Sequence, residues 1–264
     1  MDYAAMARYH WEKDADITVG VHPVPQEEVN QLGILKRGED GRVVAFVEKP
    51  KDPAVQAQFV SSEDPERPFL ASMGIYMFKT SVLVDLLTNF PDHDDFGHQV
   101  IPNAIRTHAV YGYGFDDYWQ DIGTIHSFYE TNLALTRADA PFNFFDPERP
   151  IYTNQRSLPG SSVEDSILKD VQLAEGCRIR KAEITHTVVG LRSQIGPGTK
   201  IKDTIIMGAD YYDLPTIKST DVRLGIGPNC VIEGAILDKN VRIGEGVVIK
   251  PFPRGTEMDA GTWV

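Results

Sequence analysis

An acidic and a basic side chain follow each other at the end of a β-rich run, in the segment Phe46-Val47-Glu48-Lys49-Pro50. Pro50 cannot donate a backbone hydrogen bond, so strand pairing is expected to end there. A lysine ammonium neutralises phosphate charge, and a carboxylate accepts hydrogen bonds from sugar hydroxyls. Glu48 and Lys49 therefore suit a sugar phosphate. A surface ion pair, which contributes little to stability, explains the same two residues.

A second carboxylate stands where a helix is expected to begin. Asp121 precedes Gly123 and Thr124, and Thr124 is of the residue type that caps helix N-termini. A carboxylate on rigid backbone at this place could ligate Mg²⁺. The alternative is that Asp121 only caps the helix.

Three further groups have polar side chains without a decisive pattern. Ser72 offers a hydroxyl to a sugar or phosphate oxygen, but a solvent-facing place on a half-buried strand explains it as well. The run Asp94-Asp95-Phe96-Gly97 offers paired carboxylates, and a polar turn after Pro91 is an equal explanation. The seven histidines show no metal-ligand spacing, so we assign them no role.

The first half of the chain alternates between strand and helix patterns, which is typical of an α/β domain. Periodicity and capping predict helices over 3–13, 81–87, 100–107 and 124–135, and strands over 17–21, 33–35, 42–48, 71–78 and 110–115. A polar segment over 52–68 is expected to be a surface loop with one helical turn.

The second half carries a repeat of about six residues. Aliphatic side chains recur in four series: Ile167, Leu173 and Ile179; Val189, Ile195 and Ile201; Ile226 and Ile232; and Leu237, Ile243 and Ile249. Several are followed by glycines (Gly196, Gly227 and Gly244). This period is typical of a left-handed parallel β-helix with three repeats in each coil. Residues 210–222 interrupt the repeat and are expected to loop out of a coil.

Composition excludes several classes of function. A chain of 264 residues with a net charge of −12 does not favour binding to nucleic acid or to an anionic membrane. We expect neither a membrane-spanning segment nor a signal peptide, because no stretch is long and apolar enough and the first residues do not have a signal-peptide pattern. Cys177 and Cys230 fall in the repeat and are expected to be small buried residues in a reducing compartment, so we expect a cytoplasmic protein.

Taken in order, several segments resemble bacterial glucose-1-phosphate adenylyltransferase, the ADP-glucose pyrophosphorylase family of glycogen synthesis. They are Phe46–Pro50, Ala71–Tyr76, Trp119–Thr124, the run Met207-Gly208-Ala209-Asp210-Tyr211-Tyr212, and Asp238-Lys239-Asn240. The resemblance covers nearly the whole chain. It implies part of a Rossmann-like nucleotidyltransferase domain over 1–138, a connector over 139–161 and a left-handed β-helix over 162–264.

The resemblance also implies an activity and a set of site residues. The family joins ATP and α-D-glucose 1-phosphate to give ADP-glucose and pyrophosphate. Glucose 1-phosphate would be bound by Glu48, by Lys49 at its phosphate, by Ser72 and by the backbone at Gly33. Asp121 would be one of two aspartates that hold the catalytic Mg²⁺, with Trp119 packed beside the site.

Some features of the family are expected to be missing. The glycine-rich loop that cradles the ATP triphosphate, and the second aspartate, have no counterpart in this sequence. We therefore expect a fragment that is inactive alone, and a homotetramer when the protein is complete. Lys239 matches a lysine that in some relatives helps bind an anionic activator, and an exposed corner lysine is the equal alternative.

Two other functions stay open at this point. One is a non-catalytic regulatory or scaffolding subunit of the same family that binds sugar phosphate or effector. The other is an acyltransferase, because hexad β-helices also build such enzymes around a histidine base. His186 is the only histidine in the coils, and no flanking motif supports that role.

Overall fold

The structure is a computed structural model that describes residues 1–147, 150–214 and 221–252. The chain forms two compact units, Met1–Trp119 and Gln120–Val264. The units divide before helix α5 (Ile125–Ala134), whereas the predicted domains divide after it, near residue 138. Among the described residues, no helix is long and apolar enough to cross a membrane.

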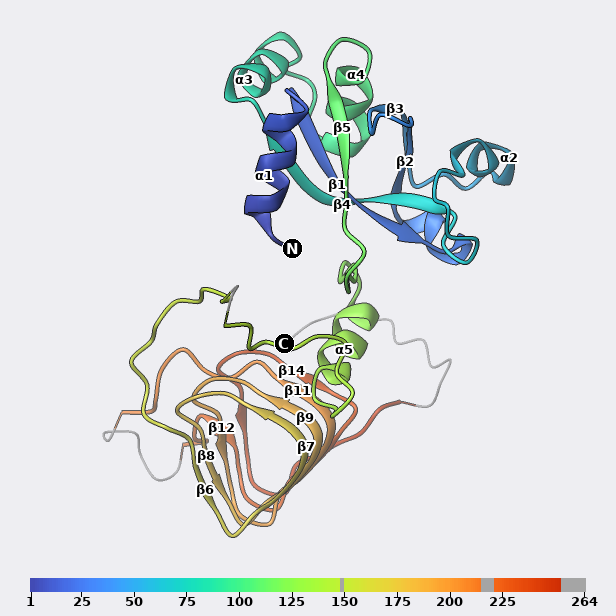
Figure 1. Cartoon of the computed structure of the whole chain (residues 1–264). Helices are drawn as coiled ribbons and strands as arrows, with labels where there is room; N and C mark the ends of the chain where they lie inside the picture. The colour runs from blue at the N-terminus through green and yellow to red at the C-terminus, as the bar shows by residue number, and fades with distance from the viewer. Residues whose placement is uncertain (148–149, 215–220, 253–264) are drawn as a thin grey trace. The chain divides into compact units, whose positions relative to one another are not determined.

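A five-stranded mixed sheet with the order β3-β2-β4-β1-β5 forms the centre of the first unit (Figure 1). The strands are β1 (Ile17–Val24), β2 (Gly33–Arg37), β3 (Val43–Glu48), β4 (Phe69–Phe78) and β5 (Val110–Gly114). Only the β1–β5 pair is parallel; β1–β4, β2–β4 and β2–β3 are antiparallel. All five predicted strands are present, and β1 continues through Pro23 to Val24.

Both faces of this sheet are covered, because successive residues of a strand point to opposite faces. Ile17, Val19 and Val21 of β1 are fully buried in a cluster that also contains Leu86 of α3 (Thr80–Asn89) and Ile101 of α4 (Ile101–Ala104). On the other face, His10 of α1 (Tyr3–Glu12) contacts Thr18, with 2.8 Å between Nδ1 and Oγ1. Strand β1 is therefore held between helices.

Short helical turns complete the first unit. They are the 3₁₀ segments η1 (Gln26–Gln31) and η2 (Ala57–Phe59), the four-residue α2 (Pro53–Gln56), and the π-helical turn η3 (Phe96–Val100) that leads into α4. The helical turn predicted within 52–68 is confirmed as α2. The helix predicted over 100–107 is shorter than expected, since α4 ends at Ala104.

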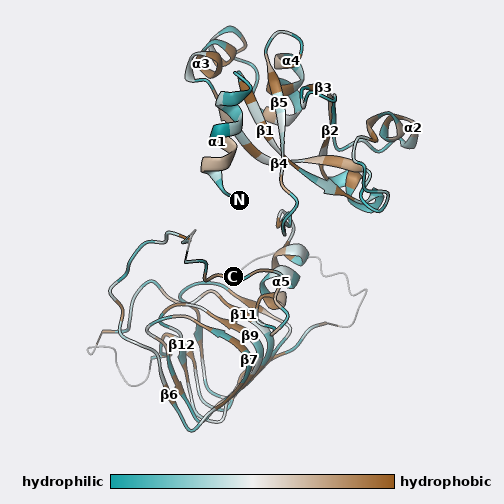
Figure 2. Ribbon diagram, in the orientation of Figure 1, coloured by the Kyte–Doolittle hydropathy of each residue, from teal (hydrophilic) through white to brown (hydrophobic). Residues whose placement is uncertain are grey.

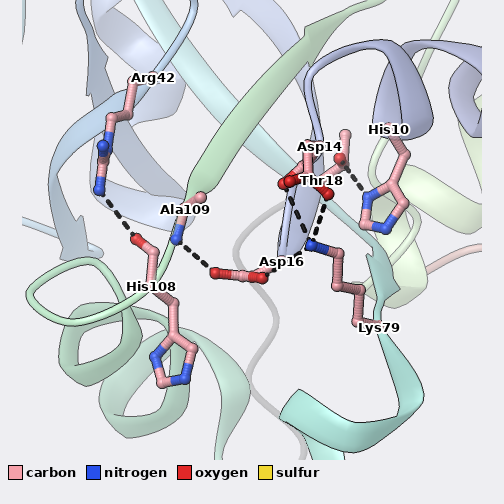
Figure 3. Close-up of polar contacts among 8 residues, drawn as sticks. All are labelled: His10, Asp14, Asp16, Thr18, Arg42, Lys79, His108 and Ala109. Carbon is pink, nitrogen blue, oxygen red and sulfur yellow. Dashed lines mark hydrogen bonds and ion pairs between the residues drawn. The ribbon is translucent and has the colours of Figure 1, made fainter.

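A charged cluster ties three strand ends together (Figure 3). Lys79, directly after β4, lies 2.8 Å from Asp14 and 3.1 Å from Asp16, measured from Nζ to Oδ1. The amide of Ala109 donates to the other carboxylate oxygen of Asp16 at 2.9 Å. Burial acts to raise the pKa of Asp16, but the bonds from Ala109 and Lys79 outweigh it, and the pKa lies below its ordinary value.

The coils of the second unit stack as three-sided turns (Figure 1). One parallel sheet has the order β15-β12-β10-β8-β6, another has the order β16-β13-β11-β9-β7, and β14 pairs with β11. The strands are β6 (Ser162–Glu164), β7 (Ile167–Leu173), β8 (Arg178–Arg180), β9 (Glu183–Val189), β10 (Gln194–Ile195), β11 (Lys200–Ile206), β12 (Gly225–Ile226), β13 (Val231–Glu233), β14 (Ile236–Leu237), β15 (Arg242–Ile243) and β16 (Val248–Ile249). The predicted left-handed β-helix fold is confirmed.

Strand register resolves the repeat into three columns of stacked side chains. Ile179, Ile195, Ile226 and Ile243 form the first, Ile184, Ile201, Ile232 and Ile249 the second, and Leu173, Val189, Ile206 and Leu237 the third. Figure 2 shows hydrophobic positions recurring from coil to coil. The spacing between successive column positions is five residues in some places and six in others, which is why the strict hexads missed Ile184 and Ile206.

One predicted core position is wrong. Ile167 pairs with Glu183, not with a member of a column, and its side chain is 65% exposed. Leu168 takes the column position in the first coil instead, because it pairs with Ile184. Cys177 and Cys230 are buried, as predicted.

The insertion after β11 leaves the coil as expected, although its residues 215–220 lie outside the described part of the chain. Tyr212 donates to the carbonyl of Gly176 at 2.9 Å. Asp213 contacts Arg242, with 2.6 Å between Oδ1 and Nη2. On the other side of 215–220, Arg242 donates to the carbonyl of Val222 at 2.9 Å, so the described residues at both ends of the insertion are fixed to the coils.

Candidate functional site

The site in the first unit is built on the pairing of β2 with β3. Gly33 pairs with Glu48 in this antiparallel register. A side chain at Gly33 would collide with Glu48 Oε2 and would come within 2.7 Å of the Phe46 ring. Only glycine leaves room for the Glu48 carboxylate to lie over the β2 backbone.

Lys49 follows in an unusual conformation. Its φ is 44°, in the left-handed region that a non-glycine residue rarely adopts. Its amide donates to the carbonyl of Leu32 at 3.1 Å, which ends the β2–β3 ladder. Its ammonium lies 3.7 Å from Glu48 Oε1 and stays accessible, since the side chain is 57% exposed whereas that of Glu48 is 16% exposed. The Glu48 carboxylate is therefore largely enclosed, whereas the Lys49 ammonium is accessible to a ligand.

Ser72 reaches the same region from β4. Ala71 pairs with Ile34, so Ser72 follows beside the start of β2. Its hydroxyl lies 3.3 Å from that of Tyr76, four residues on, because β4 bulges at Gly74 with a φ of 68°. The half-buried Tyr76 has a raised pKa, mainly through burial and further through Glu48 and Asp95, against the Ser72 hydrogen bond. Tyr76 is therefore a neutral hydroxyl between two carboxylates.

The η3 turn and Asp95, which caps it, complete this group. A side chain at Gly97 would meet Glu48 Oε2 at 2.6 Å, so η3 lies against the acid from the other side. Asp95 caps the turn by accepting from the amide of His98 at 2.7 Å. Phe96 stacks on Tyr76 with 5.5 Å between ring centroids.

Paired carboxylates and a polar turn were equal predictions for Asp94-Asp95-Phe96-Gly97, and the structure brings this turn to Glu48. No spacing rule relates residue 48 to residue 97, because a tertiary contact between η3 and β3 joins them. The signal for this site in the sequence was that an aromatic residue and a glycine, Phe96 and Gly97, directly follow Asp95.

Seven residues gather at the end of β3, and we call them the β3-end site: Gly33, Glu48, Lys49, Ser72, Tyr76, Asp95 and Phe96. They provide carboxylates that accept from hydroxyl groups, one accessible ammonium and two aromatic rings. Such a set matches a polyhydroxylated ring that carries one anionic group.

Trp119 packs at the end of the first unit. Its ring centroid lies 5.5 Å from that of His22 on β1, and its side chain joins the cluster of Ile34, Phe69 and Ala71. His22 contacts the carbonyl of Phe115 at 2.7 Å through Nδ1. Trp119 therefore fixes the segment that follows β5 onto the sheet.

Asp121 belongs to the second unit and is exposed. Its carboxylate lies against Gly123, where a side chain would come within 3.1 Å of Oδ2. Thr124, not Asp121, caps α5, in a reciprocal capping box with Ser127. The alternative that Asp121 is merely the cap is therefore wrong, and its oxygens are available to a ligand.

Asp121 can supply one ligand to a Mg²⁺ ion, but it does not form a complete metal site. Within the described ranges, no three His, Cys, Asp or Glu side chains converge as a metal site. Mg²⁺ prefers oxygen ligands and commonly takes one or two carboxylates together with substrate phosphates and water. An exposed single carboxylate is compatible with that mode and not with a closed metal cage.

Lys239 lies at a corner of the β-helix with its ammonium engaged. Its Nζ is 2.9 Å from Asp210 Oδ1, and Asn240 donates to the second oxygen of that carboxylate at 2.9 Å. The hydrogen bond from Lys239 is the main cause of a lowered pKa at Asp210. The side chain of Lys239 is 53% exposed.

The fold joins an α/β domain to a β-helix, and comparisons with known families identify both parts. Residues 1–138 match the nucleotidyl transferase family, and residues 156–263 match the GLGC left-handed parallel beta-helix domain. The chain therefore belongs to the nucleotidyl transferase family.

A curated relative identifies the branch of that family. Over 265 residues the chain is 43% identical to the glucose-1-phosphate adenylyltransferase small subunit, chloroplastic/amyloplastic, of Triticum aestivum. The match covers 94% of this chain and 56% of the wheat protein, so the chain spans little more than half the length of this relative. The resemblance to glucose-1-phosphate adenylyltransferases is confirmed, and the acyltransferase alternative is not.

Proposed function

We propose that this chain takes part in the synthesis of ADP-glucose and pyrophosphate from ATP and α-D-glucose 1-phosphate, and that the β3-end site binds glucose 1-phosphate. The observation that carries the proposal is the placement of Glu48 over Gly33 and against Gly97, with the Lys49 ammonium beside it. Family membership supports the reaction class.

Each residue of the β3-end site has a role in this proposal. Glu48, with 16% of its side chain exposed, accepts hydrogen bonds from glucose hydroxyls in a fixed orientation. Phe96 and Tyr76 face the apolar side of the ring, and Ser72 donates to a phosphate or sugar oxygen. Lys49 neutralises the phosphate.

The chemistry needs alignment more than acid or base catalysis. A phosphate oxygen of glucose 1-phosphate forms a bond to the α-phosphorus of ATP while the bond to pyrophosphate breaks. The chain lowers the barrier by orienting the nucleophile and by reducing its repulsion from the triphosphate. We further propose that Asp121 contributes one ligand to a Mg²⁺ ion, which would neutralise charge on the phosphates.

The proposal includes assembly as a homotetramer. The first coil supports association, because its outward side chains Val163 and Ile167 are 43% and 65% exposed. Light scattering coupled to size-exclusion chromatography would measure the mass, and a monomer at micromolar concentration would contradict this part.

Two measurements on the same preparation test the function. Isothermal titration with glucose 1-phosphate, glucose 6-phosphate and inorganic phosphate is expected to show preference for the first. Pyrophosphate release with ATP, Mg²⁺ and glucose 1-phosphate then measures turnover. Preferential binding with turnover supports an enzyme, and preferential binding without turnover favours a non-catalytic subunit. Equal or absent binding of the three anions would overturn the assignment of the site.

A further inference from the structure

The turn that begins η3 lies between the core and the surface of the first unit. Val100 and Ile101, where η3 passes into α4, are 2% and 0% exposed and belong to the core cluster of the sheet. Asp94, Asp95 and Phe96, at the other end of the turn, are exposed. The two residues that η3 contributes to the β3-end site, Asp95 and Phe96, are therefore accessible to a ligand and need to be held in place.

The side chain of Gln99 closes this turn. Its Oε1 accepts from the backbone amides of Asp94 and Asp95 at 3.0 and 3.1 Å. In return, the Asp95 carboxylate accepts from the amide of His98 at 2.7 Å, and the Asp95 carbonyl accepts from the amide of Gln99 at 3.1 Å. Side chains from both ends of η3 thus cap it reciprocally, in the manner of a capping box. Since both partners of the Gln99 side chain are N–H donors, only its carbonyl oxygen can serve them.

The same turn makes the contacts that shape the β3-end site. Glu48 Oε2 and Asp95 Oδ1 lie 2.6 and 3.4 Å from the point where a methyl group on Gly97 would stand, so the two carboxylates converge there. The Phe96 ring stacks on Tyr76 with 5.5 Å between centroids and 25° between planes. A displaced turn would therefore move one carboxylate, one aromatic ring and the backbone that lies against Glu48.

Lys49 is positioned by a different set of bonds. Its amide donates to the carbonyl of Leu32 at 3.1 Å, and its ammonium lies 3.7 Å from Glu48 Oε1. In the proposed function, the phosphate contact consequently depends on the pairing of β2 with β3. The contacts of Asp95 and Phe96 with the sugar ring depend on the η3 turn instead.

We propose that Gln99 is a positioning residue for recognition of the sugar ring. It holds Asp95 and Phe96 at the β3-end site, and so it sets how much better glucose 1-phosphate binds than phosphate alone. The inference rests on the proposed function of that site. When the turn leaves the binding conformation, the affinity for the sugar falls by the fraction of molecules that remain competent.

The test uses the full chain, with glucose 1-phosphate and inorganic phosphate as the probes. Gln99→Met keeps a side chain of similar length and removes the acceptor, whereas Gln99→Glu keeps an oxygen in the place of Oε1. Gln58→Met is the matched control. Gln58 is an exposed glutamine of the same unit, and its amide donates to the carbonyl of Ala54 at 3.2 Å.

Isothermal titration should show that Gln99→Met binds glucose 1-phosphate about three- to tenfold more weakly, roughly the effect of one lost hydrogen bond, with the affinity for inorganic phosphate unchanged. Gln99→Glu and Gln58→Met should keep the ratio of the two affinities. Solvent exchange of the Asp94 and Asp95 amides, followed by nuclear magnetic resonance, should be about tenfold faster in Gln99→Met, because their acceptor is gone. It should stay unchanged in Gln99→Glu.

Several outcomes would overturn the inference. Faster exchange of the two amides with unchanged affinity for glucose 1-phosphate would show that the turn does not control binding. Equal losses for both ligands in Gln99→Met would indicate a general loss of structure. A loss in Gln99→Glu as large as in Gln99→Met would show that the acceptor oxygen is not the cause.

Failure of the proposed function is distinguishable from failure of this inference. If the unaltered chain binds glucose 1-phosphate no better than inorganic phosphate, the assignment of the β3-end site fails, and the role of Gln99 fails with it. If the unaltered chain and Gln99→Met show the same preference for glucose 1-phosphate, only the role of Gln99 fails.

Discussion

The carboxylate of Glu48 lies over the backbone of Gly33, at a place where a single methyl group on Gly33 would displace it. The antiparallel register of β2 and β3 creates this contact, and Gly97 closes the other side. The orientation of the acid is therefore determined by two glycines that are distant in sequence.

Gly33→Ala should accordingly weaken glucose 1-phosphate binding. Moving one charge-assisted hydrogen-bonding group out of place costs about 1.5–3 kcal/mol, or roughly ten- to a hundredfold in affinity. Isothermal titration measures the change. Gly160→Ala is the control, because nothing lies within 4 Å of the added methyl there. Equal affinity in both variants would show that Glu48 does not contact the sugar.

The β-helix register predicts unequal effects for two isoleucines. Ile201 is 2% exposed and stacks between Ile184 and Ile232, so Ile201→Ala should lower the free energy of unfolding by about 2–5 kcal/mol. Ile167→Ala removes a side chain that is 65% exposed and should change it by less than about 0.5 kcal/mol. Denaturant titration followed by circular dichroism compares them, and similar losses would refute the register.

The cluster around Asp16 predicts a dependence of stability on acid pH. The folded state holds the pKa of Asp16 below its ordinary value, so the carboxylate stabilises the fold above the unfolded pKa of about 4. That contribution is lost as pH falls through the lower, folded pKa. Asp16→Asn should cost about 1–2 kcal/mol at neutral pH, and the difference from the unaltered chain should shrink in acid.

Asp14→Asn provides the comparison for this cluster. Asp14 contacts the same Lys79, but its side chain is 93% exposed, and exposed ion pairs contribute little. Thermal unfolding between pH 3 and 7 should separate the two variants. A pH-independent effect of Asp16→Asn would contradict the assignment.

The anion-binding prediction for Lys239 can be separated from the corner-lysine alternative. Asp210 holds the Lys239 ammonium at 2.9 Å and would compete with an anion. Asp210→Asn should therefore strengthen phosphate binding near Lys239 several-fold, on the order of one hydrogen bond to a charged group. Chemical-shift titration with phosphate at constant ionic strength measures this affinity. Lys200→Gln is the control, because Lys200 lies between a different pair of coils. Identical titrations in Asp210→Asn and the unaltered chain would leave Lys239 as a structural residue.

Local patterns predicted much of this fold because local physics determines those elements. Thr124 caps α5 as its residue type implies, and each predicted strand of the first unit is present. The β-helix was visible because one inward side chain in each repeat must be apolar. Its register was less well predicted, since the spacing varies between five and six residues and Ile167 lies next to the true column position at Leu168.

The site was predicted in part for a related reason. Glu48 and Lys49 are adjacent in sequence, so the sequence alone could predict that they act on the same ligand. Asp95 and Phe96 meet Glu48 through a tertiary contact, which no spacing rule describes. The hydrogen bond between His186 and Asp203 in the β-helix was missed for the same reason, since the stacking of coils brings together residues 17 positions apart.

The most direct test of the account is the affinity for glucose 1-phosphate in Lys49→Ala, compared with Lys36→Ala, an exposed lysine on β2 of the same sheet. If Lys49 binds the phosphate, its removal should weaken glucose 1-phosphate at least about tenfold and ATP far less, and Lys36→Ala should leave both unchanged. Equal losses for glucose 1-phosphate and ATP in Lys49→Ala, or equal affinities in the two variants, would contradict the placement of the sugar phosphate at the end of β3.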